Sequence, residues 1–525
     1  MTLAHAGSMV VVVAALLAVG GVAGAQERGG DEPGAVRQLT DTVNPSRTHE
    51  YPSVAVDPTD RRTVVAADVE FVTSTCLTHI STNGGRTWTE GASPQSMGYS
   101  NCGITNHNFY QTQWSTGLAY APDGTLYYAF AAAKPADGMS RSILLARSTD
   151  DGRSWETTVV HRSPPGSGRD ATVHVRPSGA VDRDNPQRVA VGWRYIPGKW
   201  TKRPTQMWMA VSNDGGATFG EPAKLGAGDF PSVAIADNAV YAFFPAAPEQ
   251  DQGPSATQQE QTALVMSKST DGGRTFKRTT LTTAAALSPP IATVDPTRNT
   301  LVVTWSDNRL ADDGVRNQVF VSRSTNGGQT WSDPVAVAPN PPDGARENVN
   351  EIYPSVAVAP NGRVDVAWYD YRNDPFPVPR DADPDYLGQM NDVFVASSTD
   401  GGRTLANEQR VTRTPIDRRI GTWNSQYFLL GHPGIAATNA GWVTAWSDTT
   451  NGRPDVQAPQ DIFAAASAGF AAAAGAQDET EFAFGWKDWL LAAELFLGGL
   501  GLALLVAWAM LRRRRPEATS ERVRT

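Results

Sequence analysis

Short runs of β-branched and aromatic residues recur between residues 36 and 470, and Gly, Pro or Asn bounds each run. The stretches 353–358, 363–368 and 392–396 show the pattern well, with sequences YPSVAV, RVDVAW and DVFVA. Runs of about five residues with such boundaries are typical of β-strands. The pattern therefore predicts an all-β domain in which groups of strands repeat. The first strands of several groups begin near a proline, at Pro52, Pro231, Pro290, Pro354 and Pro433.

An eight-residue motif follows the third run of each group and occurs six times. Its first copy reads STNGGRTW at 81–88 and its second STDDGRSW at 148–155. The other copies span 212–219, 269–276, 324–331 and 398–405. Asp or Asn at the third position can accept hydrogen bonds from amides ahead of it, and the glycines that follow allow positive φ. Because it recurs in every group, we interpret this third residue as scaffold. It is Asn83, Asp150, Asp214, Asp271, Asn326 or Asp400.

The motif resembles the Asp-box of sialidases and related β-propellers, S-x-D-x-G-x-T-W. This resemblance implies a propeller in which each Asp-box turn joins the third and fourth strands of a blade. The repeat period is about 60 residues, longer than that of common propeller repeats, and long loops account for the difference.

The number of blades depends on both ends of the domain. After the sixth Asp-box, three more strands are predicted near 433–436, 442–446 and 461–464, without a box. A blade needs four strands, and residues 36–40 can supply the outer one. Pairing the two chain ends would close the ring and remove exposed sheet edges. We therefore predict seven blades over residues 35–467. The alternative is six blades, as in sialidases, with an appended hairpin.

Both ends of the chain carry features of export. Residues 1–25 end in Ala-Gly-Ala and read as a signal peptide, with an uncleaved N-terminal anchor as the alternative. Residues 489–511 are apolar and long enough to span a bilayer, and 512–525 begin with four arginines. With 468–488 as a linker, this predicts a single-pass cell-membrane protein with an extracellular propeller and a cytoplasmic C-terminus.

The net charge of -9 and the pI near 5.4 disfavour nucleic acid as a partner. In an exported chain the two cysteines, Cys76 and Cys102, are expected to form a disulfide. No CxxC motif or Cys/His cluster occurs, so neither a metal nor another cofactor is predicted.

Loops opposite the Asp-boxes carry arginines, carboxylates and aromatic residues. Sialidases use three arginines for the substrate carboxylate, a Tyr nucleophile with a Glu partner, and an Asp acid/base. By position, the resemblance implies Asp370, Glu351 and Tyr427 as catalytic candidates. The binding candidates are Arg47, Arg309, Arg346 and Arg372. The first strand departs from the family motif, since Glu50-Tyr51-Pro52 contains no arginine. A structural reading stays open for the Trp-x-Asp strand ends at Asp307, Asp370 and Asp448.

Three functions remain open. The chain can be a surface propeller that binds a glycan or a cell-surface protein without catalysis. It can instead be a sialidase or another glycoside hydrolase, or a structural envelope protein without a ligand. A Tyr–Glu pair beside three arginines would favour a sialidase, whereas aromatics and arginines without that pair would favour binding.

Overall fold

The structure is a computed structural model of the whole chain. Its described residues are 35–40, 48–70, 75–94, 117–132, 142–166, 173–196, 205–246, 263–284, 288–310, 316–338, 350–376, 388–420, 431–451 and 460–473.

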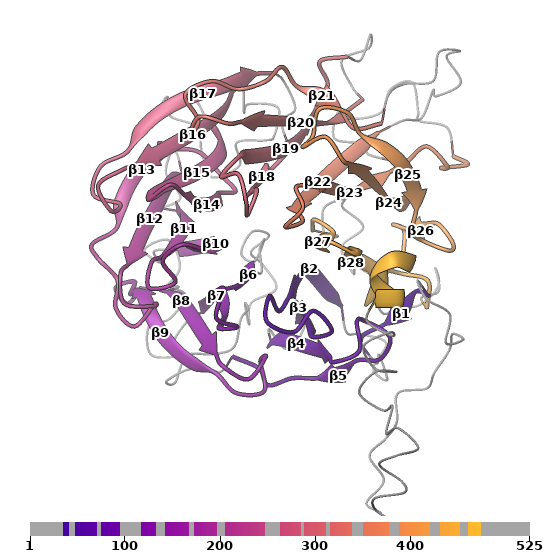
Figure 1. Cartoon of the computed structure of the whole chain (residues 1–525), viewed down its shortest axis with the longest axis horizontal. Coiled ribbons are helices and arrows are strands. Elements are labelled where there is room, and N and C mark those ends of the chain that lie inside the picture. Colours follow the sequence, from indigo (N-terminus) through magenta and orange to yellow (C-terminus); the bar gives the residue numbers. More distant parts are fainter. Residues whose placement is uncertain are drawn as a thin grey trace, which may run out of the picture.

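Seven antiparallel sheets are arranged in a ring, so the prediction of seven blades is confirmed (Figure 1). From inner to outer strand, the first three blades are β2 (His49–Val56), β3 (Val64–Glu70), β4 (Thr75–Ser81), β5 (Thr89–Glu90); β6 (Gly117–Tyr120), β7 (Leu126–Ala132), β8 (Ser142–Ser148), β9 (Glu156–His161); and β10 (Val173–Val181), β11 (Val189–Ile196), β12 (Gln206–Ser212), β13 (Ala223–Ala227). The next two are β14 (Ser232–Ala236), β15 (Ala239–Ala246), β16 (Ala263–Ser269), β17 (Lys277–Thr283); and β18 (Ile291–Val294), β19 (Leu301–Asp307), β20 (Gln318–Ser324), β21 (Val335–Ala336). The last two are β22 (Glu351–Val358), β23 (Val364–Asp370), β24 (Met390–Ser398), β25 (Ala406–Arg410), with β26 (Ile416–Asp417) beside β24; and β27 (Gly434–Thr438), β28 (Gly441–Asp448), β29 (Asp461–Ala466), β1 (Arg37–Gln38).

The hydrophobic core lies between neighbouring blades. One buried cluster joins Met207 and Met209 of the third blade to Val233 and Phe244 of the fourth. Alternate residues along each strand face one neighbour or the other, so both faces of a blade are apolar. This explains why the middle strands read as nearly continuous hydrophobic runs.

The first strand of the chain closes the ring, as the sequence predicts. Strand β1 pairs antiparallel with β29, with Arg37 opposite Ala464 and Gln38 opposite Phe463. The Leu39 amide donates to the Ile462 carbonyl at 2.8 Å. The last blade therefore combines three C-terminal strands with one N-terminal strand.

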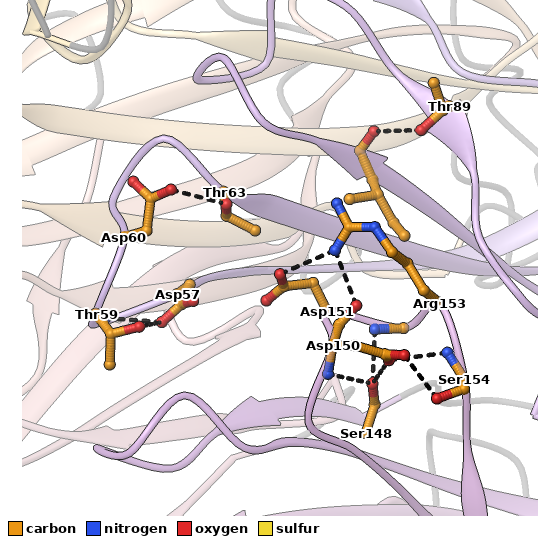
Figure 2. A network of polar contacts seen from close by, with 12 residues as sticks. Asp57, Thr59, Asp60, Thr63, Thr89, Ser148, Asp150, Asp151, Arg153 and Ser154 are labelled. Atoms are coloured by element: carbon orange, nitrogen blue, oxygen red, sulfur yellow. Dashed lines mark hydrogen bonds and ion pairs between the residues drawn. The ribbon is translucent and has the colours of Figure 1, made fainter. Parts of the chain in front are cut away.

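Each Asp-box is a hydrogen-bonded turn, and the second copy shows its construction (Figure 2). Asp150 accepts from the Ser154 amide at 2.8 Å and from the Ser148 hydroxyl at 2.7 Å. The Gly152 amide, at φ 84°, donates to the Ser148 oxygen. At the fourth position, Asp151 adopts φ 59° where five of the six boxes have glycine. These contacts engage the box carboxylate in the turn itself.

The strand order gives the ring two distinct faces. In each four-stranded blade the Asp-box joins the third and fourth strands, so the third strand ends at the Asp-box face. The antiparallel order then places the beginning of the inner strand and the end of the second strand at the opposite end. We call this end the distal face.

Residues 468–473 form a short helix after β29. Its Phe470 and Ala471 are buried in the core between the last and the first blade, and Arg86 donates to the Ala471 carbonyl at 3.0 Å. Within the part of the chain that the structure describes, no helix is both long and apolar enough to cross a membrane. The predicted signal peptide, residues 1–25, and the predicted spanning segment, residues 489–511, lie outside the described residues.

Candidate functional site

Four inner strands carry a bulky residue with positive φ directly before a proline. These residues are Tyr51, Arg176, Phe230 and Tyr353, with φ between 48° and 57°. This region is sterically unfavourable for such side chains, and it persists only when the surrounding structure enforces it. Tyr51, Arg176 and Tyr353 lie in the first half of an inner strand, and Phe230 lies two residues before β14, so all four are at the distal face.

The side chains of these residues converge across the ring axis. The Tyr51 hydroxyl in the first blade is within electrostatic reach of Arg176 in the third blade and Tyr353 in the sixth. The third and sixth blades lie on opposite sides of the first blade. Residues from both can interact with the Tyr51 hydroxyl only near the ring axis. The Arg176 guanidinium stacks 3.7 Å above the Phe230 ring, and the Tyr353 and His432 ring centroids are 5.3 Å apart. We call Tyr51, Arg176, Phe230, Tyr353 and His432 the axial cluster.

The axial cluster is only slightly exposed. Tyr51, Arg176 and Tyr353 are buried, while Phe230 and His432 are half-buried. Burial lowers the pKa of His432 to about 4, so its imidazole is neutral at physiological pH. Burial, with a further contribution from the Glu50 carboxyl, raises the pKa of the Tyr51 hydroxyl well above its usual value of 10.0, although Arg176 opposes this.

A buried ion network joins the third and fourth blades beside the axial cluster. Asp229 pairs with Arg176 and also with Arg194, whose Nη1 lies 2.8 Å from the carboxylate. Burial lowers the pKa of Arg194 to about 10, which leaves it cationic at neutral pH. Two guanidinium groups therefore share one carboxylate, and the network carries a net positive charge.

Two buried glutamates lie near the beginning of inner strands, with different surroundings. Glu351, a predicted catalytic residue, accepts a hydrogen bond from the Val319 amide of the neighbouring blade at 2.9 Å. Glu50 is 0% exposed, and neither of its carboxyl oxygens accepts a hydrogen bond from a residue in the described part of the chain. Burial raises the pKa of Glu50 well above its usual value of 4.5.

The first blade also contains a buried His–Asp–His arrangement. The Asp68 carboxylate lies 2.6 Å from Nδ1 of His49 and 2.7 Å from Nε2 of His79. His49 is therefore a buried residue of the inner strand β2. The main chain of His49 also exchanges two hydrogen bonds with Gln460 of the last blade.

The Trp-x-Asp strand ends have one arrangement in three blades. Asp307, Asp370 and Asp448 each accept a hydrogen bond from the indole of the tryptophan two residues earlier, at 2.7, 3.1 and 2.9 Å. All three carboxylates are buried. This repeated contact supports the structural reading that the sequence left open.

The two predicted arginines that the structure describes are each paired with the aspartate two residues earlier and with one residue of an outer strand. Arg309 donates to Asp307 at 2.8 Å and to Thr282 at 2.9 Å. Arg372 donates to Asp370 at 2.8 Å, pairs with Glu408 of the outer strand β25, and stacks 4.2 Å from the Phe394 ring. None of these contacts joins Arg309 or Arg372 to the axial cluster.

Several predicted residues lie outside the described residues, namely Arg47, Arg346, Tyr427 and Cys102. Cys76 is buried in β4, within the core between the first two blades. The disulfide between Cys76 and Cys102 stays a prediction. Among the described residues, no group of three or more His, Cys, Asp or Glu side chains is arranged to hold a metal ion.

Sequence reasoning missed most of the axial cluster, although a signal was present. Four inner strands contain a bulky residue followed by Pro-Ser, at 51–53, 176–178, 230–232 and 353–355. In three of them the serine oxygen accepts from an amide of the next blade, namely Leu118, Val233 and Ala292. The repeated proline and serine thus fix the inner strands to one another and position the residue before them.

We expect Arg372→Ala to lower the free energy of unfolding by about 2 kcal/mol, because the buried Asp370 loses its charged partner. Ligand binding at the axial cluster should be unchanged. Urea unfolding of the full-length chain measures the effect. Arg147→Ala is the control, since its pair with Glu156 is exposed on both sides and should contribute less than about 0.5 kcal/mol. Unchanged stability with weakened ligand binding would contradict this structural role.

Comparison with known proteins gives similarity in fold alone. No protein-family model and no curated protein matches the chain. Similar solved structures include the NanB sialidase from Streptococcus pneumoniae, with 10% identity and a TM-score of 0.42 over 63% of this chain and 67% of that one. The α-L-arabinofuranosidase Arb93A from Fusarium graminearum is 14% identical, with a TM-score of 0.41 over 65% and 93%. The α-L-arabinanase from Penicillium chrysogenum is 15% identical, with a TM-score of 0.39 over 74% and 100%. The assignment of the propeller fold and of its seven blades rests on the strand pairing of the chain itself.

Proposed function

We propose that this chain is a cell-surface propeller, anchored by residues 489–511, that binds a glycan at the axial cluster without catalysis. The convergence of side chains from five blades at the distal end of the ring axis carries this proposal. Aromatic rings can stack on sugar rings, and a buried arginine can donate several hydrogen bonds. Four of the five residues also have strained backbones, which occur preferentially at functional sites.

The course of the last strand supports display of this site away from a membrane. Strand β29 runs toward the Asp-box face, so residues 468–473 leave the ring on the side opposite the axial cluster. A C-terminal anchor would then hold the Asp-box face nearer the bilayer than the distal face.

The engagement of Asp229 and Asp370 favours binding over hydrolysis. Most glycoside hydrolases use two carboxyl groups that act on one bond. Asp229 is held by two arginines, and Asp370 is bonded to Trp368 and Arg372. The raised pKa of Tyr51 also opposes its ionisation as a nucleophile.

An exo-sialidase or another glycoside hydrolase is the second candidate. The adjacency of Glu50, Tyr51 and Arg176 favours it, because a Tyr–Glu pair beside arginines is the set that the sialidase resemblance implies. Turnover that Tyr51→Phe abolishes would support this candidate. A structural envelope protein would show neither binding nor turnover.

The test presents the full-length chain in detergent to a glycan array and to a fluorogenic sialoside. We expect glycan binding without release of the fluorophore. Phe230→Leu should weaken binding about threefold to tenfold, because it removes an aromatic face from the axial cluster. Phe219→Leu is the matched control, since Phe219 is a half-buried aromatic of an Asp-box on the opposite face. Equal loss in both variants, or no glycan bound, would reject the proposed site.

A further inference from the structure

Glu50 is a buried acidic residue whose carboxyl group has no hydrogen-bond partner in the described part of the chain. Its side chain has no exposed surface. A buried carboxyl in this state is unfavourable for folding, because it gives up its bonds to water without replacing them. Such groups call for an explanation other than stability.

The fold itself does not require a carboxyl at this position. Glu50 is the last paired residue before the β-bulge of its inner strand, opposite Val69. The equivalent residues are Val175, opposite Arg194, and Ile352, opposite Tyr369. Both are buried, so an aliphatic side chain fills this place in two other blades.

The Glu50 carboxyl lies beside the axial cluster. It interacts electrostatically with the Tyr51 hydroxyl, which also interacts with Arg176 and Tyr353. Glu50 also directly precedes Tyr51 in β2, at the distal end of the inner strand. Because Glu50 is fully buried in this state, contact with a ligand requires neighbouring side chains to move.

We propose that Glu50 is a ligand-contacting residue of the axial cluster, and that hydroxyl groups of a neutral sugar complete its missing hydrogen bonds. This inference rests on the proposed glycan-binding function and names the chemistry of the ligand. A hydroxyl both donates and accepts, so it can pair with either protonation state of a carboxyl. A carboxylate only accepts hydrogen bonds, so it pairs with Glu50 only when Glu50 is protonated, and an ammonium group gains an ion pair only when Glu50 is ionised.

Glu50→Ile in the full-length chain tests this inference by two measurements. The melting temperature should rise by about 2 °C, because an aliphatic residue replaces an unsatisfied carboxyl. Affinity for the neutral glycan that the parent binds most tightly on the array should fall at least about tenfold. Glu351→Leu is the matched control. It should lower the melting temperature, because the Val319 amide loses its acceptor.

The outcomes separate this inference from the proposed function. A more stable Glu50→Ile variant with weakened glycan binding supports the inference. Unchanged binding, or a lowered melting temperature, would overturn the role of Glu50 while glycan binding by the parent still stands. Selective binding of acidic glycans by the parent would overturn the ligand class proposed here. No glycan binding by the parent would remove the proposed function itself.

Discussion

A chain that lacks residues 26–44 is expected to melt at a markedly lower temperature than the parent. The deletion removes β1 and with it the pairing of Arg37 and Gln38 with β29. It also removes Thr40, whose hydroxyl donates to the Asp461 carboxylate at 2.8 Å and accepts from the Ile462 amide at 3.0 Å. About four hydrogen bonds and the packing of Leu39 disappear, so unfolding should become easier by roughly 5 kcal/mol.

Calorimetry of the full-length protein, with and without this deletion, measures the effect. A shorter deletion of residues 26–34 is the control, because it leaves β1 in place and should melt like the parent. The larger deletion should also increase aggregation, since it exposes the edge of β29. If both deletions leave the melting temperature unchanged, β1 does not hold the ring closed.

The fold was predictable because its signals repeat. Six Asp-boxes place a turn at the same point of six blades, and the runs before them have the length and boundaries of strands. The seventh blade has no box, but its three strands left a place that residues 36–40 could fill. Repetition converts weak local signals into one consistent arrangement.

The site was less predictable, because it depends on departures from the repeat. Sequence reasoning favoured Arg309 and Arg372 because arginines beside aspartates suit an anionic sugar. In the structure each arginine is paired with the aspartate two residues before it, which is a contact within one strand end. A chemically suitable composition does not reveal whether a charge is already neutralised by its own neighbours.

The axial cluster depends on backbone conformation, which propensities do not report. Positive φ at Tyr51, Arg176 and Tyr353 occurs at the β-bulges of their inner strands. Their meeting at the axis is a property of ring geometry, since they are more than 100 residues apart along the chain. The repeated Pro-Ser pair was the available signal, and it was recognised only as the start of a strand.

Asp68→Asn is expected to reduce the free energy of unfolding by about 3 kcal/mol at pH 5 to 6, because it removes a buried carboxylate shared by two histidines. Burial alone would lower the pKa of His49, but the Asp68 carboxylate outweighs it and raises that pKa above 6.5. Burial would raise the pKa of Asp68, whereas the charge of His49 and hydrogen bonds from both histidines lower it below 3.8.

The two pKa shifts determine how the effect of Asp68→Asn should vary with pH. The contribution of His49 is complete below pH 6.5 and is lost as the pH rises through its folded-state pKa. The contribution of Asp68 is present above pH 3.8 and is lost as the pH falls through its folded-state pKa. The difference between parent and variant should therefore be largest near pH 5 to 6 and smaller at pH 9. His432, with its pKa lowered to about 4, destabilises both proteins equally as the pH falls below 6.5, so it cancels in this difference.

Urea unfolding at pH 5.5 and pH 9 measures both values, with Asp60→Asn as a partly exposed control in the same blade. An equal difference at the two pH values would show that His49 carries no additional proton in the folded state.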